Sequence, residues 1–153
     1  MISFSNPQAQ YNTYKKDIDI AIQKVLSGNQ FILGKNVSSF EREFAKFIGV
    51  DHVIGVGSGT DAICIALRAL DIGSGEEVIA PSHTAVATVA AIEMAGAIPV
   101  LVDIDPIYYT ISPEAIKKAI TGRTRAVIAV HLYGQPANME EILGVAKKHD
   151  LKV

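Results

Sequence analysis

Three glycines separate two apolar runs in the stretch VIGVGSGTDAICIAL, residues 53–67. The first run indicates a buried strand and the second an apolar helix, so Gly59, Thr60 and Asp61 would form the first turn of that helix. N–H groups at a helix start have no carbonyl partner within the helix, and together with the helix dipole they favour an anion. Gly59 would let a phosphate approach the backbone closely. The turn is therefore a candidate phosphate site, provided that the Asp61 carboxylate points away; a plain strand-to-helix turn is the alternative.

Two other nucleotide-binding motifs fit this turn less well. Gly57, Gly59 and Ala62 satisfy the dinucleotide pattern G-x-G-x-x-A, which also requires an acidic residue at the carboxyl end of the next strand. Glu76 and Glu77 have roughly the required spacing but stand at the start of that strand. The Walker pattern fails because no Gly-Lys-Ser or Gly-Lys-Thr follows the glycines.

Further candidate site residues follow the other apolar runs. His83 and His131 stand at predicted strand ends, where a hydrogen-bonded structural histidine is as good an interpretation as a ligand-binding one. Asp103 and Asp105 could hold a divalent cation, but two carboxylates after a strand more often cap the following turn, so we assign no metal site. Cys64 lies on a helix that is apolar nearly all round and is interpreted as a core residue.

Short runs rich in Val and Ile alternate with helical patterns along the chain. Four continuous apolar runs predict buried parallel strands: Val53–Val56, Val78–Ala80, Ile98–Val102 and Ala126–Val130. Four patterns between and after them predict helices: residues 60–70, 84–95, 113–120 and 139–149. This alternation predicts an α/β fold of three αβα layers around a mostly parallel sheet. The carboxyl ends of its strands would meet at one edge, where open α/β sheets bind ligands.

Local signals indicate where several helices begin. Ser38 with Glu41 and Asn138 with Glu141 both have capping-box spacing, and Ser112 precedes a proline that suits the first turn of a helix. Residues 11–26 are roughly amphipathic, and we expect an N-terminal helical arm over residues 1–30. Residues 151–153 read as the start of another strand, which would leave the last unit unfinished and indicates a fragment of a larger domain.

Composition restricts the function classes. The chain has 153 residues, of which 49% are hydrophobic and 20% charged, so it can bury a core. Its net charge of −2, without a basic cluster, argues against nucleic-acid binding. One cysteine and no signal-peptide pattern favour a cytoplasmic protein, and the most apolar stretch, residues 85–102, is too interrupted to be a membrane span.

Three sequence blocks, in order, resemble the DegT/DnrJ/StrS-type sugar aminotransferases, which are fold-type-I enzymes dependent on pyridoxal phosphate (PLP). The blocks are SGTDA at residues 58–62, GEEVI with a following proline at 75–81, and HLYGQP at 131–136. The resemblance covers residues 31–153 and implies that this range is the N-terminal part of the PLP-binding large domain. It also implies that the backbone of Gly59, Thr60 and Asp61 holds the cofactor phosphate.

Two departures from the family pattern affect the predicted site. Many relatives have an aromatic residue directly after the threonine that corresponds to Thr84, where it stacks on the cofactor ring, whereas this chain has Ala85. His83 is therefore the candidate for the planar face. The family's Schiff-base lysine, and the acidic residue that pairs with the pyridine nitrogen, are expected beyond Val153. We therefore assign no catalytic residue within the chain and expect this segment alone to be inactive.

The resemblance implies a PLP-dependent aminotransferase that moves an amino group from an amino acid, typically glutamate, to a nucleotide-linked keto sugar. It further implies a homodimer that acts in amino sugar biosynthesis. One alternative is a pyridoxamine-phosphate-dependent sugar dehydratase of the same family, in which histidine replaces the lysine. Another is a non-catalytic relative that binds a ligand or has a regulatory role. The residue at the lysine position would separate these three functions.

Overall fold

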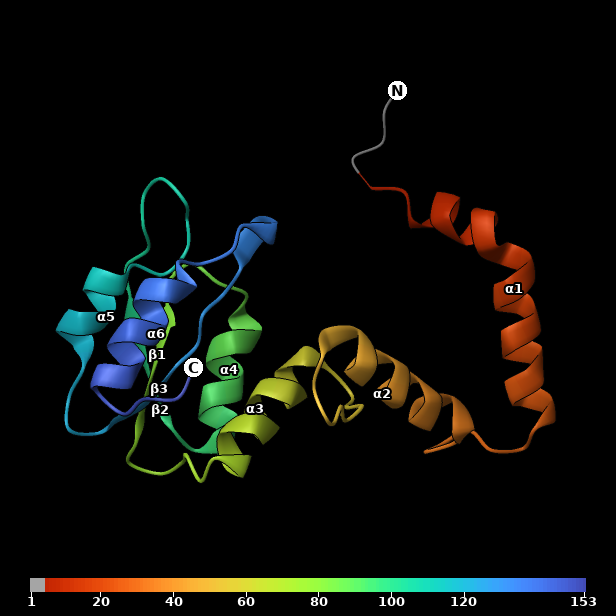
Figure 1. Cartoon of the computed structure of the whole chain (residues 1–153), viewed down its shortest axis with the longest axis horizontal. Helices are drawn as coiled ribbons and strands as arrows, with labels where there is room; N and C mark the ends of the chain where they lie inside the picture. The colour runs from red at the N-terminus through yellow and green to blue at the C-terminus, as the bar shows by residue number, and fades with distance from the viewer. Residues whose placement is uncertain (1–4) are drawn as a thin grey trace. The chain divides into compact units, whose positions relative to one another are not determined.

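A computed structural model describes residues 5–153 and contains two compact units, divided between Gly55 and Val56. The first unit contains two helices, α1 (Pro7–Ser27) and α2 (Lys35–Ile48). The second unit contains the other elements (Figure 1): α3 (Gly59–Ala69), β1 (Glu77–Pro81), α4 (Val86–Ala95), β2 (Ile98–Val102), α5 (Pro113–Ala119), β3 (Thr124–Val127), the short 3-10 helix η1 (Leu132–Gly134) and α6 (Met139–Lys148). No helix among the described residues is long and apolar enough to cross a membrane.

Helix α1 begins where its local sequence favours a helix start. The Asn6 side chain accepts a hydrogen bond from the Ala9 N–H at 3.0 Å, and Pro7 occupies the first turn, where its lack of an N–H removes no helix bond. The helix that residues 11–26 predict is thus confirmed. Residues 1–4 of the predicted arm lie outside the described residues, and the extent of the arm stays a prediction.

Helix α2 begins earlier than the capping-box pattern predicts. Its N-cap is Gly34, so Ser38 lies inside the helix and the predicted start at Ser38 is wrong. Glu41 instead reaches the chain after the helix, where its Oε1 accepts a hydrogen bond from the Gly55 N–H at 2.8 Å. The Ser-x-x-Glu spacing therefore marks a position within α2 and not its first residue, since this spacing is equally compatible with a helix interior.

The segment Val53–Val56 does not form a strand, and the prediction that it belongs to the sheet is wrong for the described residues. Ile54 and Val56 are 78% and 41% exposed. The Gly55 N–H is bonded to the Glu41 carboxylate and not to the carbonyl of a neighbouring strand. An apolar run favours burial but does not specify its partner, and no strand among residues 5–153 pairs with this segment.

The sheet of the second unit is parallel, with the strand order β2-β1-β3. Its strands confirm three of the predicted four, although β3 begins two residues before the predicted Ala126. Lys152 forms a parallel bridge with Ala126, as expected for the start of a further strand at residues 151–153. Strand β1 therefore lies between two partners, and β3 has a partner on each side at Ala126.

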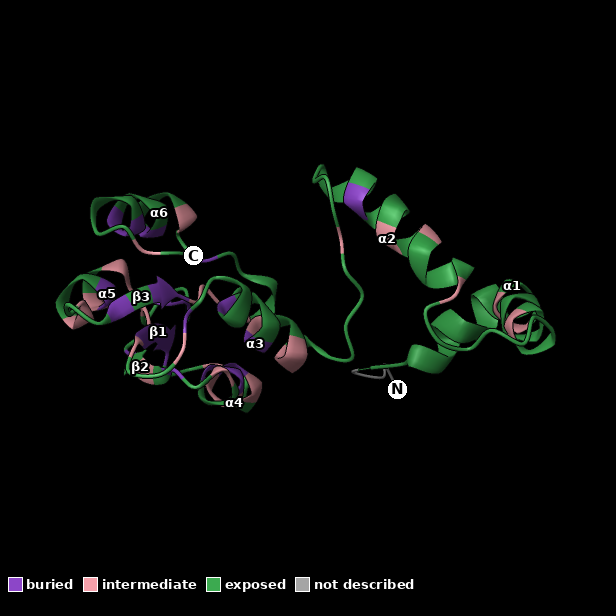
Figure 2. Cartoon of the chain, turned by 90° about the horizontal axis from the view of Figure 1, so that it is seen from below, coloured by how far each residue is buried: buried purple, intermediate pink, exposed green. Residues whose placement is uncertain are grey.

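Helices cover both faces of this sheet, which confirms the predicted αβα layers (Figure 2). Val78 of β1 packs with Leu67 and Ile92 on the face covered by α3 and α4. Ile79 points to the opposite face and packs with Ile142 among residues of α5 and α6. Successive residues of a strand alternate between faces, and β1 is buried at every position. Burial on both faces explains why its sequence is apolar without alternation.

Two predicted helix starts in the second unit are confirmed. Ser112 accepts a hydrogen bond from the Ala115 N–H at the start of α5. Asn138 accepts one from the Glu141 N–H and donates its own Nδ2–H to Glu141 Oε1 at 2.8 Å. These side chains satisfy N–H groups that have no carbonyl partner within their helices.

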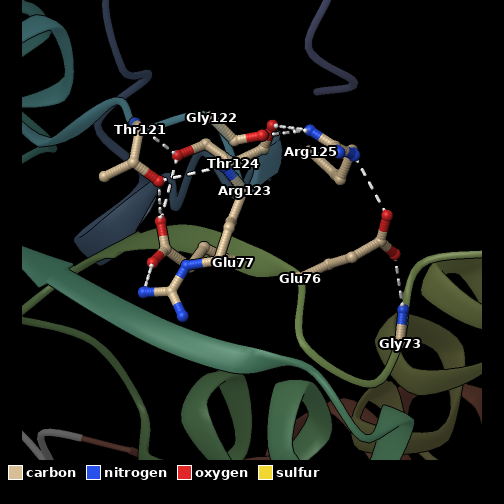
Figure 3. Close-up of polar contacts among 8 residues, drawn as sticks. All are labelled: Gly73, Glu76, Glu77, Thr121, Gly122, Arg123, Thr124 and Arg125. Atoms are coloured by element: carbon tan, nitrogen blue, oxygen red, sulfur yellow. Dashed lines mark hydrogen bonds and ion pairs between the residues drawn. The ribbon is translucent and has the colours of Figure 1, made fainter.

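A buried carboxylate fixes the start of β1 to the residues that open β3 (Figure 3). Glu77 is only 4% exposed. Its Oε2 accepts hydrogen bonds from the hydroxyls of Thr121 and Thr124, and its Oε1 pairs with the Arg123 guanidinium. Four hydrogen-bonding or charged groups from two distant segments thus meet at the amino end of the sheet, opposite the edge where a ligand is expected.

The neighbouring glutamate stabilises an irregularity in the same pairing. Glu77 is opposite Thr124 whereas Val78 is opposite Ala126, so Arg125 is the extra residue of a bulge in β3. The Arg125 Nε–H donates to Glu76 Oε1 at 3.0 Å. Both glutamates therefore act in strand pairing.

The hydrogen bond from Thr121, together with the charge of Arg123, holds the pKa of the Glu77 carboxyl below its ordinary value of 4.5. A carboxyl whose pKa is lower in the folded state stabilises the fold above its unfolded-state pKa. That contribution is lost as the pH falls through the lower, folded-state value.

We predict that Glu77→Gln lowers the free energy of unfolding at neutral pH, because the buried charge that pairs with Arg123 is removed. The difference from the unsubstituted protein should shrink as the pH falls from 7 toward about 3, since Glu77 then becomes protonated and neutral. Urea unfolding followed by circular dichroism at several pH values measures this difference. Glu93→Gln removes the same charge from an exposed position on α4 and serves as the control. A difference independent of pH would contradict the assignment.

Candidate functional site

The glycine turn forms the start of helix α3, as predicted, and Ser58 is its N-cap. The Ser58 Oγ accepts a hydrogen bond from the Asp61 N–H at 3.1 Å and donates one to Asp61 Oδ2 at 2.8 Å. The Asp61 carboxylate is thus held at Ser58, and its N–H already has a partner. Because the first N–H groups of a helix have no carbonyl partner within it, Gly59 and Thr60 carry the N–H groups that a ligand could use.

Gly59 faces open space at this helix start. A Cβ added there would meet no heavy atom within 4 Å beyond its chain neighbours and its own helix backbone, and the residue has no positive φ. Neither strain nor packing among the described residues therefore requires glycine at this position. An anion on the Gly59 and Thr60 N–H groups would require it, because a side chain would occupy the space beside them. The turn consequently fits a phosphate group.

A local contact favours glycine at position 57. A Cβ on Gly57 would lie 3.0 Å from Asp61 Oδ2, which is closer than side chains normally approach. The bare backbone at Gly57 therefore makes room for the carboxylate that Ser58 holds. Gly57 thus serves the local structure of the turn, and Gly59 leaves space for a ligand.

His83 lies at the carboxyl end of β1 and contacts a residue that follows β3. Its Nε2 is 3.1 Å from the Tyr133 hydroxyl, and the two ring centroids are 5.8 Å apart with planes inclined at 56°. Tyr133 belongs to η1, which begins five residues after β3 ends. The contact between His83 and Tyr133 thus joins the segments that follow β1 and β3.

A loop after β2 brings a third ring to His83. The Tyr109 ring centroid is 6.4 Å from that of His83, with planes inclined at 57°. Asp105 shapes this loop: its Oδ1 accepts hydrogen bonds from the N–H groups of Ile107 and Tyr108 at 2.8 and 2.9 Å. The prediction that Asp105 caps a turn is therefore confirmed. His83, Tyr109 and Tyr133, here called the aromatic cluster, come from the segments after all three strands.

The other predicted site residues have mainly structural contacts. His131 Nδ1 accepts a hydrogen bond from the Ala137 N–H at 3.0 Å, which closes the loop before α6. Gln135, from the HLYGQP block, donates its side-chain amide N–H to the Pro136 carbonyl. Cys64 is buried, as predicted for a core residue. No hydrogen bond or ring contact among residues 5–153 joins the start of α3 to His83, although α3 packs against the helix that follows it, α4.

A cavity of about 520 Å³ opens beside the same loops, but its chemistry does not suit a phosphate. Its lining includes the carboxylates of Asp105, Glu114 and Glu141 together with Tyr108 and Gln135. Three carboxylates repel an anion. Of these two places, the start of α3 is the one with the donors and the space that a phosphate needs.

Sequence reasoning missed Tyr109 and underestimated Ser58. Tyr109 has a φ of 58°, a backbone conformation that only a minority of non-glycine residues adopt, and nothing in the pattern DIDPIYYT predicts it. A signal for Ser58 did exist, because Ser-x-x-Asp before an apolar run is a recognised helix start.

The sequence comparison gives one family and close relatives. Residues 12–153 match the DegT/DnrJ/EryC1/StrS aminotransferase family. The dTDP-3-amino-3,6-dideoxy-alpha-D-galactopyranose transaminase of Aneurinibacillus thermoaerophilus is 46% identical over 153 residues, which are 100% of this chain and 42% of that protein. The chain thus spans less than half the length of this relative.

Solved structures lead to the same family. DesV of S. venezuelae, in complex with a ketimine intermediate, superposes with a TM-score of 0.95 at 43% identity over 98% of this chain and 40% of its own. NtdA of Bacillus subtilis, with bound cofactor PMP, gives a TM-score of 0.90 at 37% identity over 93% of this chain and 33% of its own. With the fold, the glycine turn and the sequence match in agreement, this chain belongs to the DegT/DnrJ/EryC1/StrS aminotransferase family.

Proposed function

We propose that the full-length protein is a PLP-dependent aminotransferase. It would transfer an amino group from an amino acid, with glutamate as the proposed donor, to a nucleotide-linked keto sugar. Membership of the family supports this proposal, as does the high identity to a named sugar-nucleotide transaminase. The observation that carries it is the start of α3, where the backbone at Gly59 is open to a phosphate and no described neighbour explains the glycine.

The residues of this chain would divide the binding of PLP between two places. The N–H groups of Gly59 and Thr60 would hold the phosphate, with the positive end of the α3 dipole behind them. Ser58 would fix the Asp61 carboxylate beside Gly57, and the Asp61 N–H, already bonded to Ser58, would take no part in holding the phosphate. His83 would lie beside the cofactor ring. It would take the role of the aromatic residue that many relatives have at the position of Ala85.

When bound, PLP supplies an electron sink for the carbon that loses a proton. The residues of this chain would bind the cofactor and orient it. The chain contributes no assigned lysine, so the proton-transferring lysine and the acidic partner of the pyridine nitrogen are proposed to lie beyond Val153. Residues 31–153 would then be the N-terminal part of the PLP-binding domain, which functions in a homodimer.

A neutral polar rim fits an uncharged sugar. Tyr133 and His83 are exposed near the carboxyl ends of the strands, and both offer hydrogen bonds without a fixed charge. Sugar hydroxyls are donors and acceptors of the same kind. A clamp of arginines would instead favour a substrate that carries carboxylates.

We predict that the full-length protein with PLP and glutamate converts nucleotide-linked 3-keto or 4-keto sugars to amino sugars. Chromatography and mass spectrometry should detect 2-oxoglutarate and the amino sugar in equal amounts. A deoxygenated sugar in place of the amino sugar would establish the dehydratase alternative instead. Failure to take up PLP would contradict the enzyme proposal altogether.

We predict that Gly59→Val in the full-length protein weakens PLP binding by roughly ten- to hundredfold, the loss expected for one or two hydrogen bonds to a charged group. The fold should be unaffected, since open space surrounds the new side chain and valine is no worse than glycine in a helix. Absorbance titration gives the affinity, and thermal unfolding without PLP checks the fold.

Gly144→Val is the matched control for this substitution. Gly144 lies in α6, and a Cβ there also meets no heavy atom within 4 Å. It should retain the PLP affinity of the unsubstituted protein. Equal PLP affinity of the two variants would argue against a phosphate site at Gly59.

A further inference from the structure

The backbone of Tyr133 adopts an unfavourable conformation. Its φ and ψ of 58° and 18° are left-handed, within the short helix η1. Bulky side chains rarely adopt this conformation unless the surroundings stabilise it, and such residues gather at functional sites. Burial does not stabilise this conformation, because Tyr133 is 79% exposed. What the conformation does achieve is the contact between the Tyr133 hydroxyl and His83.

Tyr109 repeats these features on the other loop. It too has a φ of 58°, it is 52% exposed, and its ring is inclined against His83. Its N–H donates to the Asp105 carbonyl at 2.9 Å, and the Asp105 N–H donates to the Thr110 carbonyl at 2.8 Å, so the loop is closed on itself. Two left-handed tyrosines from different loops therefore converge on one exposed histidine.

We propose that Tyr133 is a positioning residue for His83: its hydroxyl donates a hydrogen bond to Nε2 and keeps the proton of the neutral imidazole on Nδ1. A neutral imidazole has one donor and one acceptor nitrogen, and the partner of one nitrogen decides which form is present. A phenol O–H is a stronger donor than a phenol oxygen is an acceptor, and an unprotonated imidazole nitrogen is a strong acceptor. The 3.1 Å contact therefore favours Tyr133 as the donor.

This assignment gives His83 a defined chemistry at the ligand edge of the sheet. With Nε2 occupied, the Nδ1–H is the ring donor that remains for an oxygen atom of a bound ligand. Tyr109 limits rotation of the ring from a second side. The consequence for cofactor binding rests on the proposed function, whereas the position of the ring proton can be measured without any cofactor.

The test compares Tyr133→Phe with Tyr108→Phe in the full-length protein. Both variants remove one hydroxyl and keep the ring. Tyr108 lies beside Tyr109 in the same loop, is 58% exposed, and makes no ring contact or hydrogen bond with His83 among the described residues. Since both hydroxyls are on exposed side chains, neither change should disturb the fold, which thermal unfolding verifies.

The first measurement uses nuclear magnetic resonance of ¹⁵N-histidine-labelled protein without cofactor, above the pH at which imidazole is protonated. His83→Gln identifies the signals of His83. The expected result is an Nδ1–H ring in the unsubstituted protein and in Tyr108→Phe, and a shift toward Nε2–H in Tyr133→Phe. An Nε2–H ring in the unsubstituted protein, or no change in Tyr133→Phe, would overturn the proposal.

The second measurement is PLP affinity by absorbance titration. Tyr133→Phe should weaken binding by about two- to tenfold, the range expected for a hydrogen bond lost through a misplaced partner, while Tyr108→Phe should not. If the full-length protein binds no PLP but the ring proton moves as expected, the proposed function fails and the positioning role of Tyr133 stands. If PLP binds and the ring proton does not move, the positioning role fails alone.

Discussion

Strand β1 is hydrogen-bonded to a parallel neighbour on each side and is buried at every position. The other elements of the second unit are arranged around this central, buried strand. Every N–H and C=O in such a strand needs a partner, because water cannot reach it. A shift by one residue would turn Ile79 to the wrong face and expose Glu77 to the apolar layers. The Glu77 contacts oppose that shift at one end. His83 follows the other end of β1 by two residues, so the register of β1 also sets where the chain that carries His83 leaves the sheet.

Features that depend on a few neighbouring residues could be predicted from the sequence. The caps at Ser112 and Asn138 are examples, because the donor and acceptor lie three residues apart. Strand β1 was also predictable, since burial on both faces leaves a continuous apolar run. The same reasoning failed for Val53–Val56, whose composition favours burial but whose pairing depends on distant residues.

The candidate site likewise combines local features that could be predicted with contacts between distant residues that could not. The glycine turn could be recognised because its helix start is local, yet its internal hydrogen bonds show that Ser58 takes the Asp61 N–H that was expected to face the ligand. The contact between His83 and Tyr133 joins residues fifty positions apart. Only the pairing of β1 with β3 brings them together. Tyr109 could not be predicted as a member of the aromatic cluster, because its position depends on a left-handed residue and on the Asp105 turn.

The strand order β2-β1-β3 has a consequence for how the chain acquires its structure during translation. The central strand of the three is also the first to leave the ribosome, and each later strand finds one of its edges free. Helix α4 and β2 can complete one side while α5 and β3 are still being synthesised, since domains generally fold from their N-terminal parts during synthesis. The sheet can thus grow outward from its centre, and no pairing made early has to be broken to admit a strand made late.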